Sequence, residues 1–373
     1  MRKTIPISQP VLGKEEIEAV IGVLKSGVLT RKDGNGPYAK TFEESFAKCI
    51  CTKYAVAMNS GTAALHAALL AADVGSGDEV IVPSFTFTST VEVVAFVGAK
   101  PVFVDIDPKT YCMDPYSFEK AITSKTVAVM PVHLYGLMAD MEAVMKIAKE
   151  HGLVVIEDAA QALGAELHGK KAGSFGDFGC FSFYATKNIT TGEGGMVAVN
   201  RRESVDILSS IRNHGEGRHH TSERLGHNYR LPELSCAVGY YQLLKLPQFI
   251  EVRRRNVAKL TSLLENIGRL VLPEEPKGYK HAWYLYTLRL RGCRAGERNK
   301  IVSRLVNAGI QAEVYYRTPV HLAPYYRRKY GFRTRVLPKT ETAARQVFSL
   351  PTHPNLTDED IRYIAVKLKK IAA

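Results

Sequence analysis

The chain has 373 residues, of which 46% are hydrophobic and 23% are charged, as is ordinary for a soluble globular protein with a large domain and a smaller one. Its apolar stretches are broken by charge, histidine or glycine well before they reach the length of a membrane span, so no transmembrane helix is expected. The formal net charge of +13 suggests nucleic-acid binding, but no helix-turn-helix, RNP or finger signature accompanies it, and we interpret it as a basic surface.

The first two-thirds of the chain alternate between apolar, strand-like runs and helical stretches. The predicted strands are Tyr54–Met58, Glu79–Val82, Pro101–Val104, Val127–Met130, Val154–Glu157, Gly179–Phe183 and Gly195–Val199. The predicted helices between them are Thr62–Ala72, Thr88–Val97, Asp114–Ala121 and Ala139–His151. This alternation predicts an α/β fold with a mostly parallel sheet and helices on both faces.

The pattern changes from about Leu231. A charged helical stretch runs through Ala258–Ile267, followed by a strand at His281–Leu290 and helices at Glu297–Ala308 and Thr357–Lys369. We interpret these elements as a smaller C-terminal α+β domain. The predicted division is residues 1–240 for the large domain, with its N-terminal segment, and residues 241–373 for the small one.

The N-terminal segment and the cysteines bear on where the protein works. The sequence MRKTIPISQP has basic residues but no apolar stretch behind them, so no signal peptide is expected. The cysteines are Cys49, Cys51, Cys112, Cys180, Cys236 and Cys293. They form no C-x-x-C pairs, so we expect no metal site, and their scatter in a long chain is typical of a reduced, cytoplasmic protein.

An acid and a lysine follow two of the predicted strands. Asp158 comes just after Val154–Glu157, and Lys187 comes after Gly179–Phe183 and before the small-residue stretch Thr190–Gly195. Open α/β sheets bind ligands beyond the carboxyl ends of their strands. Such a pair suits pyridoxal phosphate, because the lysine can form a Schiff base and the acid can keep the pyridine nitrogen protonated.

The stretch Glu157–Gly195 resembles the DegT/DnrJ/EryC1/StrS family of sugar aminotransferases, a branch of the fold-type I pyridoxal-phosphate enzymes. Further blocks are similar to the family and occur in its order over roughly residues 5–325: Asn59–His66, Pro83–Phe87, Pro101–Asp107, Pro131–Gly136 and Asn228–Leu231. The resemblance implies the fold-type I fold, pyridoxal phosphate as cofactor, and catalytic roles for Lys187 and Asp158.

The resemblance also implies roles for other residues. Gln161 would contact the ring hydroxyl of the cofactor, and Phe87 would lie against its ring. Gly61, Thr62 and Ser182 would bind its phosphate. Asn228 would reach the phosphate in the neighbouring subunit, which implies a homodimer with shared active sites. Arg230 would lie near the anionic part of the substrate, and Tyr316 and His321, with Tyr315 and Tyr325 nearby, would line the sugar pocket.

Each of these residues also has an ordinary structural interpretation. Thr62 and Asp158 could be helix caps, Phe87 a core residue, and Lys187 and Arg230 surface residues. Asn228 could belong to a turn, and the aromatic segment around Tyr316 and His321 could simply pack between domains. His133 and His214 are left without a functional role.

The implied function is transfer of an amino group from glutamate to a nucleotide-linked keto-sugar, with a 4-keto-hexose favoured over a 3-keto-hexose. One alternative is a nucleotide-sugar dehydratase of the same family. The dehydratase branch that is recognisable from sequence has histidine in place of the Schiff-base lysine, so Lys187 argues against this alternative. A second is an aminotransferase for a keto-cyclitol. A third is a non-catalytic regulator that binds nucleic acid through its basic surface. We expect no membrane partner.

Overall fold

The structure is a computed structural model that describes residues 4–31, 36–217, 221–265 and 267–372. Its centre is a seven-stranded sheet in the order β1-β9-β8-β5-β4-β2-β3. These strands are β1 (Tyr54–Met58), β2 (Glu79–Pro83), β3 (Lys100–Val104), β4 (Thr126–Val129), β5 (Val154–Asp158), β8 (Phe178–Ser182) and β9 (Gly195–Val199). β9 is antiparallel to both of its neighbours, and the other pairings are parallel, which confirms the predicted mostly parallel sheet.

Both faces of this sheet are buried, because alternate side chains along each strand enter different cores. In β1, Ala55 and Ala57 join one hydrophobic cluster, and Val56 and Met58 join the other. The first face is covered by α2 (Pro37–Ile50), α5 (Pro115–Lys120), α6 (Met141–Glu150) and the first half of α8 (Glu233–Leu264). The second face is covered by α3 (Gly61–Ala71), α4 (Ser89–Phe96) and α7 (Arg202–Arg212).

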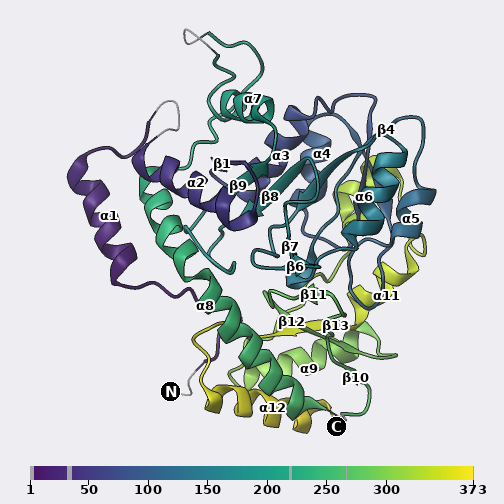
Figure 1. Cartoon of the computed structure of the whole chain (residues 1–373). Coiled ribbons are helices and arrows are strands. Elements are labelled where there is room, and N and C mark those ends of the chain that lie inside the picture. Colours follow the sequence, from purple (N-terminus) through teal and green to yellow (C-terminus); the bar gives the residue numbers. More distant parts are fainter. Residues whose placement is uncertain (1–3, 32–35, 218–220, 266, 373) are drawn as a thin grey trace.

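The helix α8 connects the two parts of the chain. Its first half packs in the core of the large sheet, and its second half, from Val257 to Leu264, packs in a separate core (Figure 1). That second core also contains β12 (Tyr286–Leu290), β13 (Val347–Leu350), α9 (Ala295–Asn307) and α12 (Asp358–Ala372). The predicted domain division at residue 240 therefore falls inside one continuous helix. Within the predicted helix Ala258–Ile267, Asn266 lies outside the described residues.

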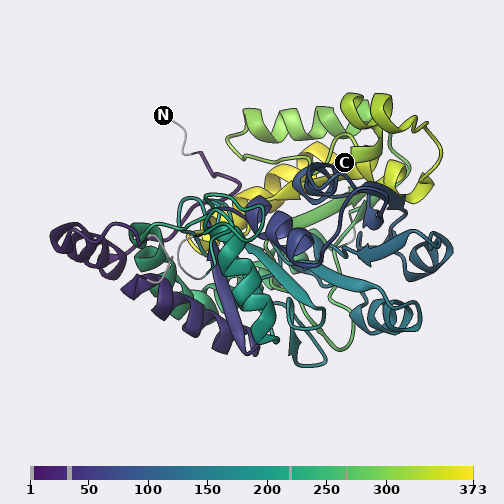
Figure 2. The same ribbon diagram turned by 90° about the horizontal axis from the view of Figure 1, so that it is seen from above.

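Several elements had no counterpart in the sequence prediction. They are α2, α7 and β13, whose bounds are given above, and α1 (Lys14–Ser26), η1 (Leu134–Gly136), β6 (Glu166–Leu167), β7 (Lys170–Lys171), β10 (Leu270–Val271), β11 (Tyr279–Lys280), η3 (Val320–Leu322), α10 (Pro324–Tyr330) and α11 (Pro338–Gln346). β10, β12 and β13 form one small sheet, and β11, β6 and β7 form another. Figure 2 shows α1 at one edge of the molecule, away from the central sheet. No helix among the described residues is both long and apolar enough to span a membrane.

The predicted strand His281–Leu290 is only half strand. Its first residues bind the η1 turn instead, since the N–H groups of Ala282 and Leu285 donate to the carbonyls of Gly136 and Tyr135 (2.8 and 3.1 Å). Because those donors are used across the domain boundary, β12 begins only at Tyr286. This departure from strand geometry brings Tyr284 to the edge of the large sheet.

Candidate active site

Asp158 ends β5 at the carboxyl edge of the sheet. Its buried carboxylate accepts two hydrogen bonds, from the Thr90 hydroxyl to Oδ2 (2.7 Å) and from the Ala160 N–H to Oδ1 (3.1 Å). Burial raises the pKa of the Asp158 carboxyl, while these two hydrogen bonds and the charge of Lys187 act to lower it. The hydrogen bonds and Lys187 thus offset only part of the cost of burying the Asp158 charge. A cationic partner would stabilise the ionised carboxylate further.

Thr90, on α4, is a site residue that the sequence analysis missed. Its hydroxyl is fully buried and lies 2.8 Å from the hydroxyl of Thr86. Because Thr90 uses its single proton toward Asp158, the Thr86 hydroxyl must donate to Thr90 Oγ1. The segment after β2 therefore orients the Asp158 carboxylate through two hydroxyl groups in series.

Lys187 follows β8 at the same edge of the sheet and is half-buried. Its backbone N–H donates to the carbonyl of Tyr184 (2.9 Å), which closes a turn after the strand. Its Nζ lies 4.7 Å from the centre of the Tyr284 ring, whose hydroxyl is 2.9 Å from Thr186 Oγ1. Tyr284, which follows α8 in the chain and packs in the core of the large sheet, thus supplies an aromatic face beside the amine, a contact that no local pattern in the sequence indicated.

The start of α3 forms the next part of the site. Its N-cap is Ser60, whose Oγ accepts the N–H of Ala63 (3.0 Å), so the interpretation of Thr62 as the cap is wrong. A Cβ at Gly61 would lie 2.8 Å from Cβ of Ser182, so glycine is needed for this close approach. The first N–H groups of a helix have no intrahelical partner and favour an anion. Gly61 and Thr62 at the start of α3 therefore lie against Ser182 at the end of β8, in an arrangement that suits a phosphate.

Gln161, Tyr316 and Phe87 meet on another side of the site. Gln161 accepts the N–H of Tyr135 and donates from Nε2 to the hydroxyl of Tyr316, both at 2.9 Å. The rings of Phe87 and Tyr316 are 6.3 Å apart. Phe87 is 57% exposed, whereas Phe85 is fully buried, so Phe87 is not a core residue. Its exposed ring is available to stack on a ligand.

Asn228 and Arg230 lie in a loop held beside the end of β1. The Asn59 side chain donates to the carbonyl of Asn228 (3.2 Å), and Arg230 Nη1 donates to Asn213 Oδ1 (2.6 Å). The Asn228 side chain is exposed and Arg230 is partly exposed. Their predicted roles at a second subunit and at the substrate stay predictions.

His321 is placed differently from the other predicted substrate-binding residues. Its side chain is fully buried, and its Nδ1 lies 2.6 Å from Ser84 Oγ. It is therefore enclosed by protein, whereas Tyr316 remains partly exposed beside Gln161.

His133 has a structural environment. The N–H of Ala139 donates to Nδ1 (3.2 Å), so Nε2 carries the ring proton and donates to Glu157 (2.9 Å). The Glu157 carboxylate also accepts the N–H groups of Gly173, Phe175 and Gly176 (2.8, 2.7 and 2.7 Å). These bonds fasten the end of β5 immediately before Asp158.

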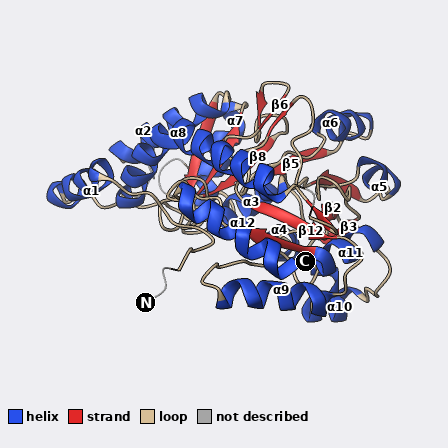
Figure 3. Cartoon of the chain, turned by 90° about the horizontal axis from the view of Figure 1, so that it is seen from below, coloured by secondary structure: helices blue, strands red, loops and turns tan. Residues whose placement is uncertain are grey.

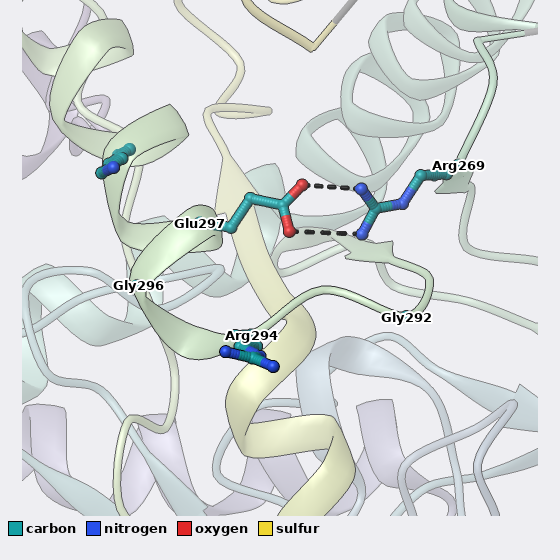
Figure 4. A pocket seen from close by; sticks show the side chains of 6 residues that line it. Arg269, Gly292, Arg294, Gly296 and Glu297 are labelled. Atoms are coloured by element: carbon teal, nitrogen blue, oxygen red, sulfur yellow. Dashed lines mark hydrogen bonds and ion pairs between the residues drawn. The ribbon is translucent and has the colours of Figure 1, made fainter.

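A separate hollow of about 720 Å³ beside α9 contains none of the groups gathered around Asp158 and Lys187 (Figure 4). It is lined by Arg269, Gly292, Arg294, Gly296, Glu297 and Lys300. The Glu297 carboxylate is already held by two hydrogen bonds from Arg269 (2.7 and 3.3 Å). None of the predicted site residues lines it. Among the described residues, no group of three or more His, Cys, Asp or Glu side chains could hold a metal ion.

The residues at the sheet edge fit pyridoxal phosphate. Asp158 offers a buried carboxylate to a cationic ring nitrogen, Lys187 offers an amine, and the Gly61 turn offers N–H groups to a phosphate. Glycine at position 61 allows the start of α3 to approach Ser182 closely, because a side chain there would clash with Ser182 Cβ. These groups thus match the cofactor's charges, because the carboxylate can accept from a cationic ring nitrogen and the N–H groups can donate to an anionic phosphate.

Comparison with known proteins agrees with this chemistry. A model of the DegT/DnrJ/EryC1/StrS aminotransferase family matches residues 10–369. The chain is 40% identical to a UDP-N-acetyl-3-dehydro-α-D-glucosamine 3-aminotransferase of Acidithiobacillus ferrooxidans, with 90% of this chain and 89% of the relative covered. It is 38% identical to GDP-perosamine synthase of Caulobacter vibrioides, with 90% of each covered. It is also 43% identical to a protein of Geobacillus stearothermophilus named pleiotropic regulatory protein, with 89% of each covered.

Among solved structures, the PLP form of the putative sugar aminotransferase Spr1654 from Streptococcus pneumoniae superimposes with a TM-score of 0.93 at 31% identity. The alignment covers 99% of this chain and 98% of that one, and the PMP form of the same protein matches equally well. The predicted fold-type I fold is thereby confirmed. With nearly its whole length matched, the chain belongs to the DegT/DnrJ/EryC1/StrS family of pyridoxal-phosphate-dependent sugar aminotransferases.

Proposed function

We propose that the protein transfers an amino group from glutamate to a nucleotide-linked keto-sugar, with a 4-keto-hexose ahead of a 3-keto-hexose. The observation that carries the reaction type is the meeting of the buried Asp158 with Lys187 at the carboxyl edge of the sheet. The partly exposed Arg230 and the net charge of +13 favour an anionic substrate, because guanidinium groups pair well with phosphate and carboxylate. Relatives that act on 3-keto-sugars and on 4-keto-sugars match this chain to a similar degree. The preference for a 4-keto-hexose therefore rests only on how common each kind of substrate is in the family.

The side chains divide the chemistry between them. Bound pyridoxal phosphate supplies an electron sink for charge that develops on the substrate carbon. Asp158 holds the proton of the ring nitrogen through its ionised carboxylate. Lys187 Nζ holds the cofactor and, once exchanged for substrate, carries a proton between carbon atoms, a general-base role that contributes roughly 10²–10⁴-fold.

We propose a homodimer whose active sites are shared between subunits. Asn228 is exposed in this chain, and Leu225 close by in the sequence is 76% exposed. The outer face of α1 also exposes Ile17 and Leu24. Exposed apolar side chains of this kind favour burial against a second chain. All six cysteines are free thiols, which agrees with the reducing cytoplasm that we propose as its location.

Lys187 is expected to be the residue that holds the cofactor. Borohydride treatment of the yellow holoenzyme should fix the cofactor to one peptide, and mass spectrometry should locate it on Lys187. The variant Lys171→Ala, which changes a lysine paired with Glu166, should label normally. Labelling of a peptide from another region would refute the assignment.

Replacing Thr90 by valine should impair the function of Asp158. A hydrogen bond to a charged group contributes about 1.5–3 kcal/mol, so turnover should fall roughly 10- to 100-fold. Because this bond lowers the pKa of Asp158, its loss should raise that pKa, and the acidic limb of the rate profile should move to higher pH.

Two further variants serve as a milder and a more severe comparison for Thr90→Val. Thr86→Val keeps the bond from Thr90 to Asp158 and should lose less activity. Asp158→Asn cannot hold the ring nitrogen protonated and should lose most turnover while keeping some cofactor. Wild-type rates and an unshifted pH profile in Thr90→Val would show that the hydroxyl does not tune the carboxylate.

A panel of ketone acceptors should identify the substrate class. We expect conversion of glutamate to 2-oxoglutarate that depends on a nucleoside-diphosphate 4-keto-hexose, with the amino-sugar detected by mass. A preference for the 3-keto isomer would reverse the order of the two ketones. Amination of a keto-cyclitol alone, or loss of water without gain of nitrogen, would establish the cyclitol or dehydratase alternative. Salt-sensitive DNA binding without turnover would favour a regulator.

Mixing two inactive variants should test the shared site. Lys187→Ala and Asn228→Ala chains, denatured and refolded together, should form hybrids with one intact site, which gives about a quarter of wild-type activity for random pairing. Each variant refolded alone is the control. If hybrids form but activity does not return, Asn228 does not act across the interface.

A further inference from the structure

The segment Ser84–Thr90 runs from the end of β2 into the first turn of α4 and carries three parts of the site. Phe87 presents an exposed ring, and Thr86 and Thr90 lead by hydrogen bonds to Asp158. The position of this segment therefore sets both the aromatic face and the orientation of the Asp158 carboxylate. The contacts that fix Ser84, the first residue of this segment, therefore affect the whole site.

Ser84 is tied to a segment far along the chain. The N–H of Val320 donates to the Ser84 carbonyl (3.0 Å), and the N–H of His321 donates to Ser84 Oγ (3.0 Å). The side chains of Ser84 and His321 are themselves 2.6 Å apart, from Oγ to Nδ1. Both side chains are fully buried. Since Ser84 Oγ already accepts one N–H, its proton can be given to Nδ1, which leaves the ring proton of His321 on Nε2.

The other edge of the His321 ring faces α11. Its Nε2 lies 3.7 Å from Oε1 of Glu341, which also accepts the N–H of Arg335 (2.6 Å). The start of the same helix is fixed to the end of β3, because the N–H groups of Lys339 and Thr340 donate to Asp105 (3.0 and 2.7 Å). Figure 3 shows α11 next to β3 at one end of the sheet. His321 thus stands between an anchored helix and the segment that shapes the site.

We propose that His321 is a positioning residue that holds the segment Ser84–Thr90, and through it Phe87 and Thr90, against the cofactor. This role differs from the contact with the sugar that the family resemblance implies. It rests on the cofactor site and is independent of which sugar is the substrate. A residue that only touched the sugar would not be enclosed by Ser84 and α11.

The two roles predict different effects in the absence of any sugar. In the positioning role, Ser84→Ala and His321→Ala should each weaken pyridoxal phosphate binding by about tenfold and reduce the visible circular dichroism of the bound cofactor. The double variant should be no worse than either single one, because both remove the same interaction. The amino-donor half-reaction should slow in all three.

Controls separate positioning from general damage to the fold. Ser349→Ala removes another fully buried serine hydroxyl, one paired with Thr287 in the small domain, and should leave cofactor affinity unchanged. His321→Asn keeps an amide within reach of Ser84 and should restore much of the affinity lost in His321→Ala. Thermal unfolding of each holoenzyme shows whether a variant has folded.

Three results would overturn the proposal. The first is wild-type cofactor affinity and dichroism in His321→Ala, with only the KM for the keto-sugar raised. The second is wild-type behaviour in Ser84→Ala. The third is a folded His321→Asn that is as impaired as His321→Ala. Because binding and dichroism are measured without donor or acceptor, failure of the proposed sugar reaction would leave these results interpretable.

Discussion

The last two residues of β5, Glu157 and Asp158, both bury a carboxylate inside the protein. An ionised carboxylate is costly to bury unless hydrogen bonds or a positive charge compensate it. Glu157 is compensated by four N–H donors, three from the loop Gly173–Gly176 and one from His133. Asp158 receives only two donors, and burial raises its pKa. Glu157 therefore fixes the strand, while Asp158 has fewer compensating donors, and the protonated ring nitrogen of a bound cofactor would supply the missing positive charge.

The other parts of the site follow from that position. Parallel strands deliver their carboxyl ends to a single edge, so the segments after β2, β5 and β8 bring Phe87, Asp158 and Lys187 together. The part of the chain after α8 also contributes, with Tyr284 beside the amine of Lys187 and Tyr316 held by Gln161. The aromatic residues beside the charged groups thus come from segments far apart in the sequence, and Tyr284 and Tyr316 both pack in the core of the large sheet.

How much of this could be predicted depended on the range of each interaction. The strands of the central sheet could be predicted because each is a short apolar run, and Asp158 and Lys187 could be predicted because they follow two of these runs. Thr90 was missed because its bond to Asp158 joins residues 68 positions apart, and Tyr284 because it reaches the lysine segment across 98 positions. The partnership of Ser84 with His321 spans 237 positions. The strand predicted from His281 was too long because its first donors serve the η1 turn.

The continuity of α8 has a consequence for how such enzymes can be recombined. Its first half completes the core of the large sheet, and its second half completes the core formed by β12, β13, α9 and α12. A cut at residue 240 would divide α8 and remove helical residues from the core of the large sheet. We therefore do not expect the two parts to fold independently. Chimaeras that exchange the small domain between relatives should keep this helix whole, with the crossover before Glu233 and the residues on both of its contact faces taken from matched parents.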